Sequence, residues 1–315
     1  MFAPEINTAR EPTMGMQWIQ RHSRKLSVGL LGLVTAVWMA SWPSVQWRTH
    51  LISLKIRGSL SRLSWSELLL QSNPQERLSE IPWDPPYPFY VKQRGEEPCP
   101  ALWETAMGAF WGRESDRVVL GTVVGEQHFQ KIYEHGPVAI RRGDVVFDVG
   151  SHLGAFTRFA LERGAGLLVA FEPDPTNIAC YKRTFQQEIA AGRVILIEAA
   201  LWEAPGTLDF TTGQHSGGGS VLPAAGNPTH LVPATTIDET VARLKLDRLD
   251  FIKMDIEGSE RHALRGGRQS ISRFSPRMAI CIYHRPDDRV AVPQEVLAAR
   301  SAYQMATTQQ VAFFH

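Results

Sequence analysis

Short apolar runs alternate with amphipathic stretches through the second half of the chain. The runs are rich in Val, Ile, Leu and Phe and predict strands at residues 144–149, 166–171, 193–198, 250–255 and 278–283. Apolar residues at helical spacing predict helices at residues 153–163, 175–190, 238–245 and 259–270. Strands that alternate with helices predict an α/β fold with a Rossmann-like, doubly wound and mostly parallel sheet.

The first predicted strand ends in an acidic residue and a glycine turn. Asp148 stands at the carboxyl end of the strand, and Gly150 and Gly154 bracket the turn. Ligands of open α/β sheets bind at such strand ends, where glycine lets the backbone approach them closely. The spacing G-x-x-x-G differs from the G-x-G-x-x-G of dinucleotide sites, and Asp148 would repel a pyrophosphate. The positive sulfonium and ammonium groups of S-adenosylmethionine suit Asp148 better. An ordinary turn with a helix-capping acid is the alternative.

The second predicted strand also ends in an acidic residue. Glu172 lies roughly 20 residues beyond the glycine turn and is followed by Pro173, a position from which an acid accepts hydrogen bonds from ribose hydroxyls. It supports a nucleoside ligand without choosing between a dinucleotide and S-adenosylmethionine. Asp174 is expected to cap the next helix rather than to bind the ligand.

Two carboxylates mark the end of the predicted strand at residues 250–255. Asp255 and Glu257 are two residues apart, so on an extended chain their side chains point the same way. Two neighbouring acids raise the pKa of one of them and can create a proton acceptor. They also suit a divalent cation such as Mg²⁺, although we assign no metal ligand from the sequence. A strand end followed by a helix with an acidic first turn is the alternative.

Four motifs follow one another along the chain: the glycine turn at residues 146–157, the acidic turn at 171–175, T-T-x-D-E at 235–239 and K-x-D-x-E-G-x-E at 253–260. In order and spacing they closely resemble the FkbM family of S-adenosylmethionine-dependent methyltransferases, over residues 125–290. The resemblance implies a class I methyltransferase fold and methylation of a hydroxyl oxygen on a sugar or secondary metabolite. Ser151 and His152 stand where the family commonly has Ala and Asn.

The strand ends and the resemblance together predict a cofactor-binding set. Asp148 and Gly150 are expected to contact the methionine part of S-adenosylmethionine, and Glu172 its ribose. Ser151, Gly154 and Pro173, which lie in the same two turns, complete the set.

Methyl transfer to a hydroxyl needs an acceptor oxygen held in line with the methyl carbon and a base nearby. Asp255, Glu257 and His284 are the predicted catalytic residues, and His152 is a further candidate base. The expected partner is a small-molecule or saccharide acceptor, including a glycan or a lipid-linked saccharide. A catalytically inactive, membrane-tethered adaptor and a NAD-dependent oxidoreductase are the alternative functions.

Composition narrows the choice of partner. The chain has 315 residues, with 33 Lys and Arg against 32 Asp and Glu. Balanced charge argues against nucleic acid as a partner, because phosphate binding needs a basic surface. Cys99, Cys180 and Cys281 are far apart and show no metal-binding spacing. Each is expected to be a small apolar filler in a reducing compartment.

The first hundred residues have a different pattern. No charged residue occurs at positions 26–47, and the strongly apolar part, 26–42, is at the lower length limit for a spanning helix. We expect residues 1–71 to associate with a membrane through an anchor helix at 26–47 and an amphipathic helix at 51–63, with a cytoplasmic catalytic domain. For the apolar segment, a secretory signal peptide and a buried core helix are alternatives. The amphipathic segment equally suits a helix that packs on the domain.

Many prolines predict a semi-rigid linker at residues 72–107, which leaves residues 108–315 as the methyltransferase domain. A piece of hairpin is expected at residues 206–211. The glycine-rich segment 212–220 is predicted to be either a mobile lid over the substrate or a disordered surface loop.

Overall fold

The computed structural model describes residues 90–94, 96–212, 216–222 and 229–315. The predicted anchor helix at 26–47 and the amphipathic helix at 51–63 lie outside these residues. Among the helices of the described part, none is both long enough and apolar enough to cross a membrane.

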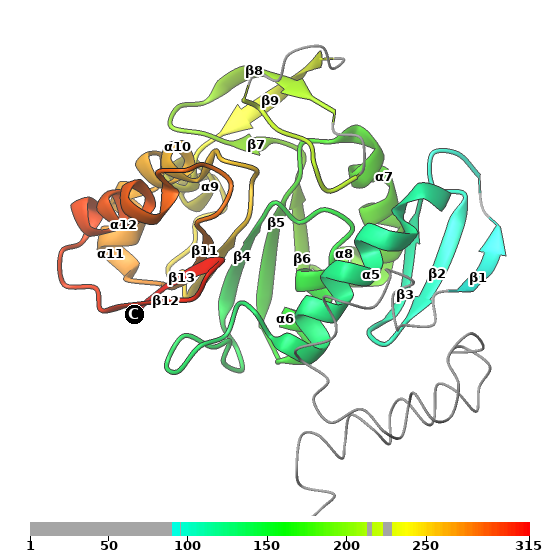
Figure 1. Ribbon diagram of the computed structural model, residues 1–315, viewed down its shortest axis with the longest axis horizontal. Coiled ribbons are helices and arrows are strands. Elements are labelled where there is room, and N and C mark those ends of the chain that lie inside the picture. The colour runs from blue at the N-terminus through cyan, green and yellow to red at the C-terminus, as the bar shows by residue number, and fades with distance from the viewer. Residues whose placement is uncertain (1–89, 95, 213–215, 223–228) are drawn as a thin grey trace, which may run out of the picture. The chain divides into compact units, whose positions relative to one another are not determined.

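A seven-stranded sheet lies at the centre of the domain (Figure 1). Its strands follow the order β12-β13-β11-β10-β4-β5-β6, and all neighbours are parallel except that β13 runs antiparallel to β11 and β12. The strands are β4 (Val145–Val149), β5 (Leu167–Phe171), β6 (Val194–Ile197), β10 (Phe251–Met254), β11 (Arg277–Cys281), β12 (Met305–Thr307) and β13 (Val311–Phe314). The predicted doubly wound, mostly parallel α/β sheet is confirmed. The five predicted strands all form, with ends shifted by at most two residues.

Helices cover both faces of this sheet (Figure 1). One face carries α5 (Arg117–Gly125), α6 (Ala155–Glu162), α7 (Pro175–Thr184) and α8 (Gln186–Ala190), and the other carries α9 (Ile237–Arg243), α10 (Glu260–Arg265), α11 (Arg268–Phe274) and α12 (Asp288–Ala299). Successive residues of a strand face opposite layers: Val146 of β4 packs in the layer of Phe156, and Phe147 in the layer of Leu264. Because both faces are buried, the strands are apolar at nearly every position.

Two predicted helices are interrupted. The helix expected at 175–190 is divided into α7 and α8 at Phe185, and the helix expected at 259–270 is divided into α10 and α11 at Gly266 and Gly267. A side chain at Gly266 would overlap the carbonyl oxygen of Trp202, and one at Gly267 would overlap Ile237. Glycine is therefore needed there for close packing, and it ends the helix.

A small antiparallel sheet precedes the main one. It consists of β1 (Tyr90–Arg94), β2 (Ala101–Thr105) and β3 (Gly108–Gly112), and leads through a short 3-10 helix, Glu114–Asp116, into α5 and a π-helical turn, Glu126–Gln130. The predicted linker at 72–107 is therefore wrong in its last part, which forms β1 and β2. Ala101 and Trp103 alternate along β2 and are buried in the core, so packing outweighs the nearby prolines.

A disulfide joins Cys99, just before β2, to Cys180 on α7. The prediction that these two cysteines are separate apolar fillers is therefore wrong. Their Cα atoms lie 5.4 Å apart although 81 positions separate them in the chain, so only the fold brings them together. Cys281 is free and buried in β11, as a small apolar filler would be.

A third sheet lies at the carboxyl edge of the main sheet (Figure 1). It contains β7 (Ala200–Leu201), β9 (Thr229–Thr235) and β8 (Gly206–Thr211), in that order, with β8 antiparallel to β9. The hairpin expected at 206–211 is confirmed by this pairing. Residues 216–222 belong to the connection between β8 and β9, and residues 216–220 of the glycine-rich segment lie at the edge where ligands of such sheets bind.

Candidate active site

A cavity opens at the carboxyl ends of β4, β5 and β10. Its wall includes Gly150 from the turn after β4, Glu172 after β5, and Asp255 and Glu257 after β10. Residues of β7 and β8 and of the segment 216–221 close its other side. The enclosed volume is ≈ 70 Å³, which is small beside the roughly 300 Å³ or more of a typical small-molecule site.

Gly150 has a left-handed backbone, with φ of +78°. A side chain at this position would overlap the carbonyl oxygen of Asp255. Only glycine lets the turn after β4 approach the turn after β10 so closely. Gly150 therefore draws together the two halves of the cavity.

Asp148 does not line the cavity, contrary to its predicted contact with the ligand. It is fully buried within β4, where Thr157 Oγ1 donates a hydrogen bond of 2.8 Å to its Oδ2 and Lys253 Nζ lies 3.3 Å from its Oδ1. Lys253 Nζ also donates to the carbonyl oxygen of Gly150 at 2.6 Å. The ion pair thus supports the glycine turn from beneath, and Asp148 positions the backbone rather than facing the ligand.

Lys253 keeps its charge in this buried position. Burial disfavours the ammonium form, but Asp148 and Asp255 outweigh it and raise the pKa of Lys253 above its ordinary value. The aromatic rings of Tyr133 and Phe156 lie 5.6 Å and 6.0 Å from its Nζ. Carboxylates, carbonyl oxygens and ring faces together replace the water that the ammonium loses.

Ser151 and Gly154 also lie away from the cavity wall. The Ser151 hydroxyl is buried without a hydrogen-bond partner among the described residues, and its backbone N–H donates to Phe171 O at 3.0 Å. Gly154 has φ of +92°, and a side chain there would overlap the ring of Phe185. Gly154 is thus needed for packing against α7 and α8, and neither residue's predicted contact with the cofactor has support from this geometry.

Glu172 and Pro173 line the cavity, and their contact with the cofactor stays a prediction. The Glu172 carboxylate accepts hydrogen bonds from the backbone N–H of His152 at 2.8 Å and of Asp174 at 3.0 Å, and from Asn177 Nδ2 at 3.3 Å. Burial raises the pKa of Glu172 to about 7 in spite of these donors. Asp174 caps α7 through the N–H groups of residues 176 and 177, as expected.

The segment 216–222 is held over the cavity by polar contacts. His152 Nε2 lies 2.6 Å from Ser216 Oγ, and Asn177 Nδ2 donates to Ser216 O at 2.9 Å. Ser220 Oγ donates to Glu257 O at 3.1 Å. Burial lowers the pKa of His152 to about 4, so the imidazole is neutral at neutral pH. For residues 216–220, these bonds argue against a disordered surface loop, while the movement of a lid stays a prediction.

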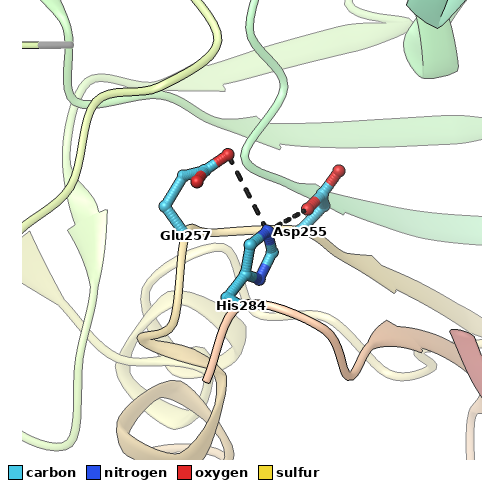
Figure 2. Close-up of side chains that lie close together, drawn as sticks. All are labelled: Asp255, Glu257 and His284. Atoms are coloured by element: carbon cyan, nitrogen blue, oxygen red, sulfur yellow. Dashed lines mark ion pairs between the residues drawn. The ribbon is translucent and has the colours of Figure 1, made fainter. Parts of the chain in front are cut away.

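The three predicted catalytic residues converge at the other side of the cavity (Figure 2). His284 Nε2 lies 3.2 Å from Asp255 Oδ1 and 3.8 Å from Glu257 Oε1. His284 lies three residues beyond β11, and its Nδ1 is 3.0 Å from Glu260 Oε1. Tyr133 donates a hydrogen bond of 2.7 Å from its hydroxyl to Asp255 Oδ2. The fold thus joins residues that are far apart in the sequence.

The two cavity carboxylates have opposite electrostatic environments. Burial opposes the ionised form of Asp255, but His284 and Lys253 outweigh it and lower the pKa of Asp255. Burial raises the pKa of Glu257 to about 7. His284 is also buried, yet Asp255 and Glu260 raise the pKa of its imidazole to about 10. The prediction that neighbouring acids acquire different pKa values therefore agrees with the geometry.

Residues 148–305, half of the chain, match the family described as Methyltransferase FkbM domain. The chain belongs to this family. The FkbM match covers both turns that line the cavity and all three residues of the acidic and histidine cluster.

Individual relatives match the FkbM chain over stretches of different length. It is 46% identical over 61 residues to the 31-O-demethyl-FK506 methyltransferase FkbM of Streptomyces tacrolimicus, a match that covers 19% of this chain and 23% of that relative. It is 21% identical to the solved structure of a methyltransferase FkbM from Methylobacillus flagellatus, with a TM-score of 0.46, over 65% of this chain and 56% of that one. Aeropyrum pernix fibrillarin, solved with S-adenosyl-L-methionine, is 11% identical, with a TM-score of 0.33, over 55% of this chain and 66% of that one.

Sequence reasoning missed two residues that shape the FkbM site. Lys253 stands in the K-x-D-x-E-G-x-E motif, and a basic residue inside an otherwise apolar strand was the signal that could have revealed a buried ion pair. Tyr133 lies before the family match and in no motif, so nothing in the sequence linked it to Asp255.

Proposed function

We propose that this chain transfers a methyl group from S-adenosylmethionine to a hydroxyl oxygen of a small molecule or saccharide. The observation that carries the proposal is the shared cavity, in which the Glu172 side, after β5, faces the Asp255 and Glu257 side, after β10, across the end of β4. A nucleoside cofactor on the first side would lie next to an acceptor on the second. Membership of the FkbM methyltransferase domain family supports the same reaction.

The residues of the first side fit the cofactor. Three N–H groups occupy part of the Glu172 carboxylate, and a carboxylate offers about four lone-pair positions, so capacity remains for a ribose hydroxyl. Gly150 presents backbone without a side chain to the methionine part. The enclosed ≈ 70 Å³ is too small for a nucleoside, so the segment 216–221 has to move aside for the cofactor to enter.

The second side provides a proton acceptor. S-adenosylmethionine supplies an electrophilic methyl group, and the acceptor oxygen becomes a better nucleophile as its proton leaves. Asp255 and Glu257 stand on the cavity wall where a carboxylate can take this proton. His284 lies behind them, away from the cavity lining, and orients Asp255. We therefore propose that a carboxylate accepts the proton of the hydroxyl group and that the histidine has a positioning role.

Calorimetric titration of the full chain tests the cofactor. We expect S-adenosylmethionine to bind with 1:1 stoichiometry and NAD not to bind, because the cavity offers Glu172 to a ribose and its carboxylates Asp255 and Glu257 repel a diphosphate. Binding of NAD in preference to S-adenosylmethionine would contradict the proposal.

A panel of saccharides and alcohols, incubated with methyl-labelled cofactor, then tests the reaction. We expect label on an acceptor oxygen, and Glu257→Gln should lower turnover about 100-fold while leaving cofactor affinity unchanged. Equal turnover in the variant would remove Glu257 from the mechanism. Label on nitrogen or carbon would overturn the hydroxyl acceptor.

A further inference from the structure

The cluster of Asp255, Glu257 and His284 has the geometry of a metal-binding site. One ligand atom from each of the three residues can be chosen so that all lie within 4.8 Å of one another (Figure 2). Atoms bound to a common ion at about 2.0–2.2 Å are separated by roughly 3–4 Å. The 3.2 Å and 3.8 Å that separate His284 Nε2 from the two carboxylates fall in this range.

His284 Nε2 gives the independent indication of a ligand. The His284 side chain is only 7% exposed, yet Nε2 forms no hydrogen bond of acceptable geometry among the described residues. Figure 2 shows this nitrogen directed toward the space between Asp255 and Glu257. This buried ring nitrogen is close to two carboxylates, but an N–H bond on it would point at neither of them. Such an arrangement suits an ion placed between the nitrogen and the carboxylates.

The other side of the ring is already anchored. His284 Nδ1 lies 3.0 Å from Glu260 Oε1, and this oxygen also accepts the backbone N–H of Ile256 at 3.0 Å. A carboxylate that holds one imidazole nitrogen fixes the tautomer that leaves the other nitrogen free to bind a metal. Tyr133 orients Asp255 in the same manner through its 2.7 Å hydrogen bond.

A protonated His284 is the competing explanation for the cluster. Its Nδ1–H would donate to Glu260 and its Nε2–H would lie 3.2 Å from Asp255 Oδ1, so the imidazole is protonated when no ion is present and a bound ion takes the place of the Nε2 proton. Asp288 and Glu260 form a second group with His284, but Glu260 in that group already contacts the ring nitrogen Nδ1. The other ring nitrogen, Nε2, is the one toward Asp255 and Glu257.

We propose that Asp255, Glu257 and His284 bind one divalent transition-metal ion at the edge of the cavity. One imidazole nitrogen and two carboxylates favour Mn²⁺ or a related first-row ion over Mg²⁺ and Ca²⁺, which prefer oxygen ligands alone. Asp255 and Glu257 line the cavity, so an ion between them keeps coordination positions open to a bound molecule.

Such an ion would also serve the acceptor, an effect that rests on the proposed function. A hydroxyl oxygen bound to a divalent cation loses its proton more readily. The hydroxyl proton would pass to the carboxylate oxygen of Glu257 that does not bind the ion. At the same time the acceptor oxygen forms its bond to the methyl carbon, and the bond between the methyl carbon and sulfur breaks. Binding of the ion itself does not depend on this step.

The test is titration of the full chain, first stripped with a chelator, with Mn²⁺ alone, followed by electron paramagnetic resonance. We expect one Mn²⁺ per chain and a signal from directly coordinated nitrogen that disappears in His284→Ala. Asp255→Asn and Glu257→Gln should each weaken binding about 10-fold or more. Asp287→Asn is the matched control, because this carboxylate is 60% exposed and pairs with Arg261, and it should bind as the unaltered chain does.

Two results would overturn the metal site. One is no stoichiometric Mn²⁺ binding by the folded chain, and the other is equal binding by Asp255→Asn, Glu257→Gln and Asp287→Asn. Methyl transfer that proceeds without any bound ion would refute its catalytic effect and leave the proposed function intact. Metal binding without S-adenosylmethionine binding would refute the proposed function and leave the metal site intact.

Discussion

Asp148 and Asp255 occupy comparable places on neighbouring parallel strands, and the structure puts them in different environments. Asp148 is the last residue but one of β4, and Asp255 is the first residue after β10. Asp148 is fully buried and paired with Lys253, its register partner on β10. Asp255 lines the cavity and contacts His284. The two acids thus differ by two positions relative to the end of their strands. The acid inside the strand forms an internal ion pair, and the acid beyond the strand lines the cavity.

Glu172 shows that this rule extends to a third strand. It is the first residue after β5, as Asp255 is after β10, and it also lines the cavity. Inside a strand, the side chain points into one of the two buried layers, whereas the residue after the strand turns over the sheet edge. The position of an acid relative to the last strand residue therefore predicts its role better than its presence in a motif does.

The largest expected effect is a loss of stability on replacement of Asp148, the buried acid of the pair. Asp148→Ala leaves the ammonium of Lys253 buried without its nearest carboxylate, so we expect the free energy of unfolding to fall by about 3–5 kcal/mol. Denaturant unfolding measures this loss. Asp148→Ala combined with Lys253→Met should lose less, because no buried charge is then left unpaired. A stable Asp148→Ala that has lost cofactor affinity would instead show that Asp148 contacts the ligand.

A smaller effect is expected at the cavity-facing acid of β5. Glu172→Ala removes an ionised acceptor of ribose hydroxyls, and hydrogen bonds to charged groups contribute about 1.5–3 kcal/mol. Affinity for S-adenosylmethionine should therefore fall about 10- to 100-fold in a calorimetric titration. The backbone N–H groups of His152 and Asp174 lose their acceptor too, so Glu172→Gln is the milder companion variant. Unchanged affinity in both variants would place the ribose elsewhere.

The pH dependence of cofactor affinity gives the smallest effect. Burial raises the pKa of Glu172 to about 7, so the carboxyl is protonated at pH 6 and ionised at pH 8. If the ionised form accepts the ribose, affinity should rise about 10-fold between these pH values. Glu172→Gln should abolish the rise. Glu126→Gln should retain it, because burial and Asp255 also raise the pKa of Glu126 to about 7 but Glu126 does not line the cavity.

Local patterns were sufficient for the strands that carry the site. The apolar runs predicted β4, β5, β6, β10 and β11, and the turns after three of them contribute residues to the wall of the cavity. The same patterns failed where packing decides: Gly266 and Gly267 break a helix because Trp202 and Ile237 leave no room for side chains. β12 and β13 were not predicted, and they complete the sheet by pairing with distant strands.

The sequence by itself determined the alternation of strands and helices and the acids that follow the strands, because backbone periodicity and turn chemistry depend on neighbouring residues. Only the tertiary structure decided which acids face the cavity, which cysteines pair, and which tyrosine and histidine meet Asp255. Tyr133 is 122 positions from Asp255, and Cys99 is 81 from Cys180. Such contacts arise when packed layers bring remote segments together, and no local pattern encodes the register at which those layers meet.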